Sequence, residues 1–188
     1  MKLIVLTAPS SAGKDSIANE LKSIFHVPIS FTTRPKRDYE VDGTDYHFIT
    51  KNEFLTKLKN NEILEYREYH TLLNGNPDIW YYGLTKDSLN YNDINVIILD
   101  LQGLRQLKEI FNASELTSIY LHVDDNERKQ RAMKRGSFCE VEWARRLEDD
   151  KRLYTKDAIN NEMDYIVENI NLTDTIKDIL DVIGMELI

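Results

Sequence analysis

Nine residues near the N-terminus have the types and order of a phosphate-binding loop. Residues 8–16 read Ala-Pro-Ser-Ser-Ala-Gly-Lys-Asp-Ser and lie between a short apolar run and a helical pattern. Backbone N–H groups of such a loop converge on an anion, and Lys14 would reach the β- and γ-phosphates of a nucleotide. An ordinary turn of small residues before a helix is the alternative. The expected nucleotide-binding residues are Pro9, Ser10, Ser11, Ala12, Gly13, Lys14, Asp15 and Ser16.

This loop departs from the strict pattern at two positions. Ala8 replaces the first glycine, and Asp15 stands where a magnesium-binding Ser or Thr is expected. A carboxylate beside phosphates repels them unless a cation intervenes, so one reading makes Asp15 a direct Mg²⁺ ligand. In the other reading Ser16 binds the metal and Asp15 only favours the helix N-terminus. The sequence leaves both readings open.

A second group of charged residues follows in the segment 30–37. Arg34 and Arg37 are three residues apart, with Lys36 between them. Arginine suits a dianionic monophosphate because its planar fork donates two parallel hydrogen bonds to phosphate oxygens. The alternative is a solvated basic patch. The adjoining threonines and tyrosines favour a phosphate site.

The elements that must position these residues alternate between strands and helices. Short apolar runs predict buried strands at 3–7, 95–99, 117–123 and 165–168, and the last helix is expected at 172–187. The helix after the loop would bury Ile17, Ala18, Leu21 and Ile24. This alternation predicts an α/β fold with a parallel sheet and helices on both faces.

Two stretches interrupt the alternation. Residues 30–85 are rich in aromatic and charged side chains, with short strand candidates at 48–50 and 63–69. Residues 126–156 carry six arginines on what the pattern predicts to be two helices. We interpret the first as an inserted substrate-binding subdomain and the second as a helical lid.

Composition excludes several classes of protein. The net charge of −8 argues against a general nucleic-acid binder. The single cysteine, Cys139, permits no intramolecular disulfide, and the N-terminal apolar run is too short for a signal peptide or a membrane span. We therefore expect a cytoplasmic protein that acts on small molecules.

Two motifs in the basic segment resemble the guanylate kinase family closely. Residues 30–37 reproduce its Ser-x-Thr-Thr-Arg-x-x-Arg pattern, and residues 40–48 reproduce Glu-x-x-Gly-x-Asp-Tyr-x-Phe. Further matches at 61–66, 81–83, 100–103, 145–147 and 164–169 extend the resemblance over nearly the whole chain. It implies a P-loop kinase of nucleoside monophosphates that transfers the γ-phosphate of ATP to GMP or dGMP with Mg²⁺. The expected partners are nucleotides, with no nucleic acid and no membrane, in a monomer or homodimer.

The resemblance also implies a division of the chain and roles for single residues. Segments 1–29, 86–125 and 157–188 form the core, 30–85 the monophosphate-binding subdomain and 126–156 the lid. The implied acceptor site is Ser30, Arg34, Arg37, Tyr46, Glu65, Tyr82 and Asp100. Arg131 and Asn169 join the ATP site, where Asn169 borders the adenine. Lys14, Arg34, Arg135 and Arg146 are the expected catalytic residues, whereas Arg128 and Arg152 are expected on a solvated helix face.

Guanine recognition is the part of the pattern that this chain alters. A carboxylate such as Glu65 can accept hydrogen bonds from guanine N1–H and the 2-amino group, a donor pair that adenine lacks. The alternative is that Glu65 is an exposed strand residue. The segment 71–80 is about eight residues longer than in the family and is expected to be a loop. Leu84 replaces a Ser or Thr, and Ile98 a carboxylate. These changes leave open a kinase that acts on another or a modified base. A separate alternative is a non-catalytic module that binds phosphorylated peptides.

Overall fold

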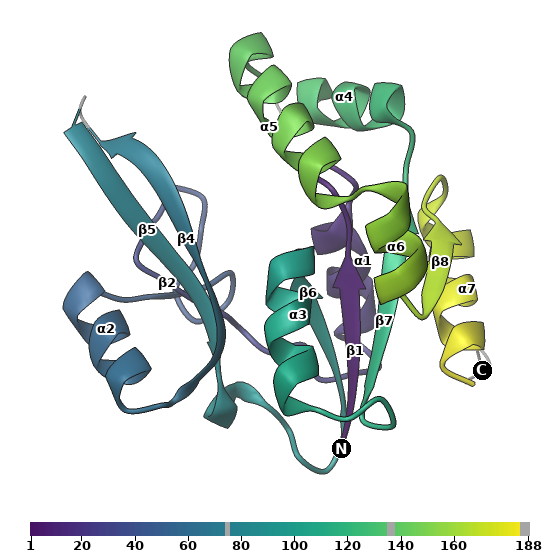
Figure 1. The fold of residues 1–188 in the computed structure, drawn as a ribbon, viewed down its shortest axis with the longest axis horizontal. Helices are drawn as coiled ribbons and strands as arrows, with labels where there is room; N and C mark the ends of the chain where they lie inside the picture. Colours follow the sequence, from purple (N-terminus) through teal and green to yellow (C-terminus); the bar gives the residue numbers. More distant parts are fainter. Residues whose placement is uncertain (74–75, 135–137, 185–188) are drawn as a thin grey trace.

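The computed structural model describes residues 1–73, 76–134 and 138–184. The chain alternates strands and helices in two neighbouring parts (Figure 1). The strands are β1 (Lys2–Thr7), β2 (Phe31–Thr32), β3 (His47–Phe48), β4 (Ile63–Leu73), β5 (Asn76–Thr85), β6 (Ile94–Leu99), β7 (Leu116–His122) and β8 (Tyr165–Glu168). The helices are α1 (Lys14–Leu21), α2 (Lys51–Lys59), the 3₁₀ turn η1 (Lys86–Ser88), α3 (Leu101–Ile110), α4 (Asp125–Lys134), α5 (Glu140–Leu153), α6 (Lys156–Glu162) and α7 (Leu172–Val182).

The core is a parallel sheet with strand order β6-β1-β7-β8. Successive residues of β1 point to opposite faces. Ile4 and Leu6 therefore pack in one apolar cluster with residues of α1 and α7, and Leu3 and Val5 pack in another with α3. Helices cover both faces, as the sequence predicts for an apolar parallel sheet. The predicted parallel α/β fold is confirmed.

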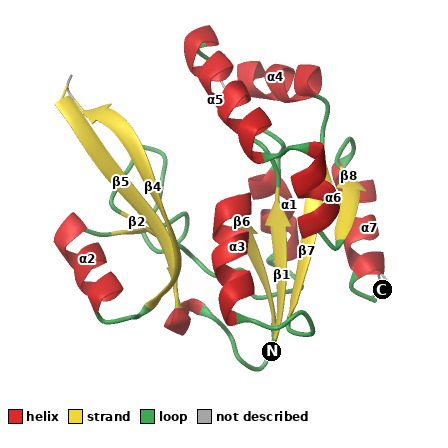
Figure 2. Cartoon of the chain, in the orientation of Figure 1, coloured by secondary structure: helices red, strands yellow, loops and turns green. Residues whose placement is uncertain are grey.

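The second part is another four-stranded sheet with order β3-β2-β5-β4, covered by α2 (Figure 2). The predicted strand at 63–69 is present but runs on to residue 73, and its antiparallel partner begins at residue 76. The expectation of a loop at 71–80 is therefore wrong for residues 71–73 and 76–80, and residues 74 and 75 lie outside the described part of the chain. Tyr69 lies opposite Trp80, and the pairing continues from there to Leu73 opposite Asn76. The rings of Tyr69 and Trp80 stack with centroids 6.1 Å apart.

Three local expectations need correction. Thr50 does not belong to a strand, because its side chain and that of Glu53 form a capping box that begins α2. Ile24 lies beyond the end of α1 and is 43% exposed rather than buried. The last helix ends at Val182, and residues 185–188 lie outside the described part of the chain.

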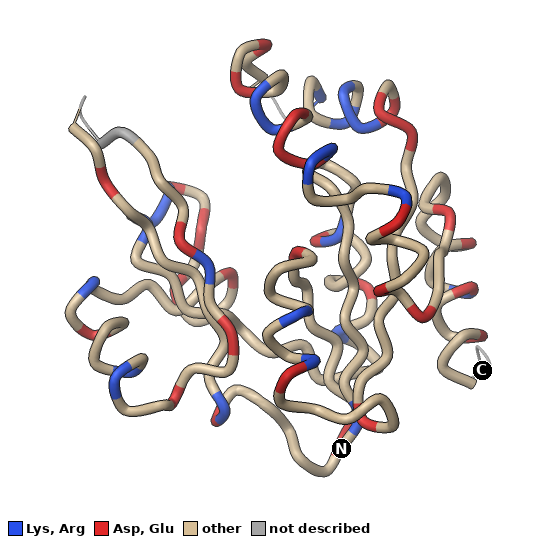
Figure 3. Tube along the Cα trace, viewed as in Figure 1, with Lys and Arg blue, Asp and Glu red and all other residues tan. Residues whose placement is uncertain are grey.

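The two helices of the expected lid, α4 and α5, lie beyond the end of the core sheet at which β1 and β6 finish (Figure 1). Both helices carry basic and acidic residues (Figure 3). One edge of the core sheet thus brings together the carboxyl ends of its parallel strands, the start of α1 and the expected lid. This is the edge at which α/β folds place ligands. Among the described residues, no helix is long and apolar enough to span a membrane.

Candidate active site

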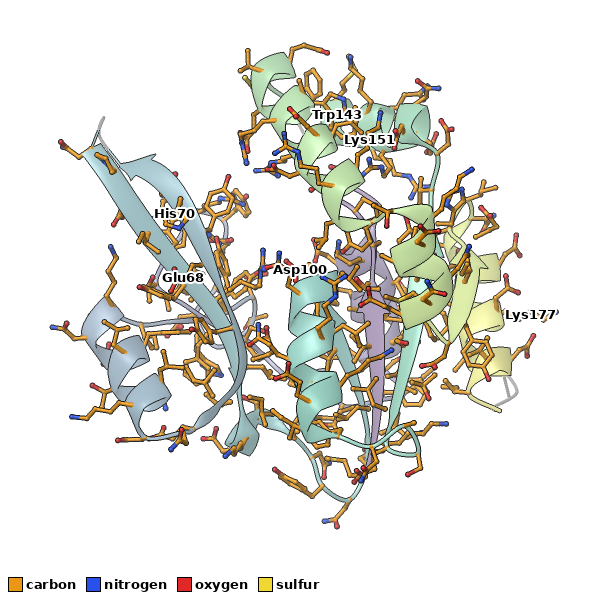
Figure 4. All side chains as sticks on the ribbon, in the orientation of Figure 1. Glu68, His70, Asp100, Trp143, Lys151 and Lys177 are labelled. Atoms are coloured by element: carbon orange, nitrogen blue, oxygen red, sulfur yellow. The ribbon has the colours of Figure 1, made fainter. Side chains whose placement is uncertain are left out.

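One cleft of about 1100 Å³ lies between the core, the second sheet and the lid. Figure 4 shows the two sides of this space, with Glu68 and His70 on β4 and Asp100 at the start of α3. Its walls include ten of the residues expected to bind nucleotides, namely Ser10, Lys14, Asp15, Ser30, Arg34, Arg37, Tyr46, Tyr82, Asp100 and Arg146. The fold therefore brings these ten residues to one cavity, whereas Glu65, expected to read the guanine, does not line it.

The loop after β1 is folded tightly around Lys14. Ser11 and Gly13 have φ values of 60° and 96°, so the chain turns through the left-handed region before α1 begins. The Lys14 Nζ donates to the carbonyl oxygens of Ala8 at 2.6 Å and Pro9 at 3.1 Å. Burial lowers the pKa of Lys14, although Asp15 and Asp150 oppose the shift. The ammonium is thus held at the open end of α1, where an anion is favoured.

Arg131 and Asn169 fix the other side of this loop. Arg131 Nη1 donates to the Ala12 carbonyl at 3.0 Å, and its Nη2 donates to the Asn169 carbonyl at 2.8 Å. The Asn169 side chain is buried and also donates to Ala12. A Cβ on Gly13 would lie 3.3 Å from Asn169 Nδ2. Neither Arg131 nor Asn169 lines the cleft; both position the loop from outside it.

Arg128 is buried, which corrects the expectation of a solvated residue. It is 1% exposed, and its Nη1 donates to Asp150 Oδ2 at 2.8 Å and to the Ser10 carbonyl at 3.1 Å. Asp150 in turn accepts the Ser10 N–H at 3.0 Å. A buried arginine and a carboxylate therefore connect both lid helices to the phosphate loop. Arg152, by contrast, is exposed and pairs with Glu148, as expected.

The two candidate metal ligands differ in position. Asp15 and Ser16 are both exposed, but Asp15 lines the cleft and Ser16 does not. Within the described residues, no three His, Cys, Asp or Glu side chains cluster as a self-sufficient metal site. A single carboxylate fits Mg²⁺, which typically uses one or two carboxylates together with substrate phosphates and water.

Arg34 lies at the centre of the expected acceptor-phosphate site. Its Nη2 and Nη1 donate to the two carboxylate oxygens of Glu40 at 2.6 and 3.0 Å, and both residues are buried. The Glu40 carboxylate also accepts the Arg37 N–H at 2.8 Å. The Arg37 side chain remains 55% exposed at the cleft. The Arg34 guanidinium is thus held by a buried ion pair, whereas that of Arg37 is exposed and donates to the Tyr39 hydroxyl at 2.9 Å.

Two tyrosines complete this site. The rings of Tyr46 and Tyr82 meet edge to face with centroids 5.9 Å apart, and the Arg34 Cζ lies 5.7 Å from the Tyr46 centroid. Burial raises the pKa of Tyr46 to about 12 and also raises that of Tyr82. Both hydroxyls therefore keep their protons at neutral pH and are donors for a phosphate.

Glu65 is buried beside the start of α3, which excludes the reading of an exposed strand residue. It is 3% exposed, and a Cβ on Gly103 would lie only 2.9 Å from its Oε2. Burial, with a smaller contribution from Asp100, raises the pKa of Glu65 to about 8. Asp100 caps α3 through Oδ1, accepting from the N–H groups of Gln102 and Gly103, while its Oδ2 lies 2.9 Å from Arg67 Nε.

The lid contacts the long hairpin across the cleft. Arg145 Nη2 donates to the Tyr69 hydroxyl at 2.7 Å, and Glu142 bonds both Arg145 and Arg146. These arginines hold the pKa of Glu142 at about 2. Arg146 is 48% exposed and faces the cleft. Arg135 lies outside the described residues.

Comparisons with known proteins agree with this geometry. The family model described as guanylate kinase matches residues 1–186. The chain belongs to the guanylate kinase family. A protein of Thermotoga maritima named guanylate kinase is 34% identical over 98% of this chain and 87% of its own length. One of Clostridium perfringens is 37% identical over 94% and 80%. The fold matches a guanylate kinase crystal structure from Anaplasma phagocytophilum with a TM-score of 0.64 and 22% identity, covering 97% of this chain and 84% of the other.

The sequence alone does not assign a role in this site to Glu40, Arg67 or Asp150. Glu40 was part of a recognised motif, and its spacing from Arg34 and Arg37 is the one signal that could have revealed it. Arg67 and Asp150 had no such signal. Their partners, Asp100 and Ser10, are 33 and 140 residues away in sequence, so only the fold brings each pair together.

Proposed function

We propose that this protein phosphorylates GMP with ATP by direct in-line transfer of the γ-phosphate. The observation that carries the proposal is the convergence of two anion sites on one cleft. One is the loop around Lys14, and the other is the group of Arg34, Arg37, Tyr46 and Tyr82. Two facing phosphate sites fit a reaction between a nucleoside triphosphate and a monophosphate.

The donor site fits the triphosphate of ATP. Backbone N–H groups at the start of α1 and the Lys14 ammonium would bind the β- and γ-phosphates. Asp15, which lines the cleft, is the favoured ligand of Mg²⁺, and Ser16 is not. Bound Mg²⁺ would supply positive charge that offsets the repulsion between Asp15 and the phosphates.

The acceptor site fits a guanosine monophosphate. Arg34, Arg37 and the two tyrosine hydroxyls would donate to the phosphate, and the buried Glu65 carboxyl group would face the N1–H and 2-amino group of guanine. The carboxyl group must be ionised to accept both bonds, so binding of guanine would lower its pKa. No general base is required, because the acceptor phosphate is already an ionised nucleophile.

The lid would complete the site as it closes. We propose the division into core (1–29, 86–125 and 157–188), monophosphate subdomain (30–85) and lid (126–156). Closure excludes water and brings Arg146 toward the transferred phosphoryl group, where positive charge stabilises the transition state. Arg131 and Asn169 support the loop in this scheme by binding its backbone at Ala12.

A coupled assay of ADP release tests the proposal. The assay contains ATP and Mg²⁺ and is run with each of the acceptors GMP, dGMP, AMP, dAMP, dTMP, UMP and CMP. Turnover with GMP, and none with the nucleotides of other bases, is the expected result. Turnover confined to another base would contradict the assignment of Glu65. No turnover with any nucleotide would contradict the proposed reaction.

A further inference from the structure

Arg67 places a positive charge at the guanine end of the proposed acceptor site. Its Nε lies 2.9 Å from Asp100 Oδ2, and the side chain is 33% exposed at the cleft. Within residues 1–73, 76–134 and 138–184, this ion pair is the only polar contact of the guanidinium. Its two Nη groups therefore keep their donors for a ligand.

The charge of Arg67 acts on Glu65, at the base end of the proposed site. Arg67 lies opposite Tyr82 in the β4–β5 pairing, but the cations that influence the pKa of Tyr82 are Arg34 and Arg37. The guanidinium of Arg67 instead lowers the pKa of Glu65, against the larger effects of burial and Asp100. Glu65 and Arg67 are two residues apart on β4 and so lie on the same face of the strand, and the ion pair with Asp100 places the guanidinium at the start of α3.

The residue that pairs with Glu65 across the two strands is apolar and carries no hydroxyl. Leu84 pairs with Glu65 across the hairpin and is fully buried in the apolar core. Glu65 and Asp100 are both acceptors when ionised, and a guanine also presents two acceptors, O6 and N7. A forked cation is the group that complements those two atoms, as arginine does when it reads guanine in nucleic acids.

We propose that Arg67 is a specificity-determining residue that donates from its Nη groups to O6 and N7 of the acceptor guanine, held in place by Asp100. This inference rests on the proposed function and adds a second contact edge to it. Glu65 reads the N1–H and 2-amino edge, and Arg67 reads the opposite edge of the same base. Asp100 is a positioning residue for this contact, because its other oxygen is fixed to the N-terminus of α3.

Two nucleotide analogues separate the two edges. 7-Deaza-GMP lacks only the N7 acceptor that Arg67 would use, whereas IMP lacks only the 2-amino donor that Glu65 would use. Calorimetric dissociation constants for GMP, 7-deaza-GMP and IMP are compared for the wild type, Arg67→Met and the control Arg105→Met. Arg105 is a suitable control because it pairs with Glu162 and does not line the cleft.

The wild type and Arg105→Met are expected to bind GMP about tenfold more tightly than 7-deaza-GMP, from the usual worth of an arginine–guanine contact. Arg67→Met should bind GMP about tenfold more weakly, lose the preference over 7-deaza-GMP and keep the wild-type preference over IMP. A general loss of structure would not remove one preference and keep the other.

The inference is overturned if Arg67→Met keeps the wild-type preference for GMP over 7-deaza-GMP, or if the wild type has no such preference. Either result leaves the proposed function intact when the wild type still phosphorylates GMP. If the wild type neither binds nor phosphorylates GMP, the proposed function and this inference fail together.

Discussion

Arg34 and Glu40 form a forked ion pair in which Nη2 donates to Oε1 at 2.6 Å and Nη1 donates to Oε2 at 3.0 Å. Both side chains are buried, and the same carboxylate accepts the backbone N–H of Arg37. The guanidinium is therefore fixed before a phosphate arrives, so less conformational entropy is lost on binding. Burial lowers the pKa of Arg34, but the hydrogen bond and charge of Glu40, with Tyr82, outweigh this effect and raise it overall. The guanidinium therefore stays fully charged.

Replacing Glu40 by Gln is expected to weaken this arrangement. The buried arginine loses its counter-charge, which typically costs about 3 kcal/mol of unfolding free energy. The KM for GMP should rise about tenfold with a smaller change in kcat, because the loss affects binding of the acceptor. Urea unfolding and steady-state kinetics measure both effects. Glu148→Gln is the control, since Glu148 is an exposed partner of Arg152, and an unchanged KM in Glu40→Gln would contradict this role.

Lys14→Ala should separate the donor site from the acceptor site. The change removes the ammonium that faces the β- and γ-phosphates, so kcat should fall about 10³-fold. GMP should still bind with a dissociation constant within about twofold of the wild type, because its phosphate site is built from other residues. Quenched-flow kinetics and calorimetry measure the two quantities. Lys177→Ala, on the exposed face of α7, should change neither, and near-normal turnover in Lys14→Ala would exclude the proposed mechanism.

Glu65 is expected to make stability depend on pH. Its pKa is raised to about 8 in the folded protein from an ordinary value of 4.5, so the folded state retains a proton that the unfolded state releases. Stability must therefore decrease as pH rises from about 4.5 to about 8 and then level off. The full loss is on the order of 5 kcal/mol, at 1.36 kcal/mol per pKa unit.

Glu65→Gln tests this pH dependence. The amide cannot ionise, so the variant should lose less stability than the wild type between pH 5 and pH 9. Denaturant unfolding at pH 5, 7 and 9 gives the comparison, and Glu109→Gln on the exposed part of α3 is the control. Parallel pH profiles for the wild type and Glu65→Gln would contradict the buried, protonated carboxyl group. GMP binding should also weaken in this variant, because an amide accepts fewer hydrogen bonds than a carboxylate.

The buried pair of Arg128 and Asp150 predicts a coupled pair of substitutions. Arg128→Met leaves Asp150 without its buried partner and should lower the unfolding free energy by about 3 kcal/mol. The double variant Arg128→Met/Asp150→Ala should recover most of that loss, since neither charge then remains unpaired. A double-mutant cycle in urea measures the coupling. Arg152→Met should have an effect below about 0.5 kcal/mol, and additive effects in the cycle would show that the pair is not coupled.

The sequence by itself determined the α/β core, the loop that follows β1 and the arginines of the acceptor site. Each depends on signals within a few residues of one another. Alternation of apolar runs and helical patterns predicts the core, and the order Gly13-Lys14 between a strand and a helix predicts the loop. The spacing of Arg34 and Arg37 indicates a phosphate site for the same reason.

Only the tertiary structure decided which of these residues are buried and which groups they contact. Asp150 reaches Ser10 across 140 positions, Arg67 reaches Asp100 from the other sheet, and Glu65 lies against Gly103. No local pattern encodes such contacts, because each depends on how separate elements pack against one another. The strand pairing at 71–73 and 76–80 escapes prediction from the sequence for a related reason. The two strands are stabilised by pairing with each other, and a strand in isolation lacks those hydrogen bonds.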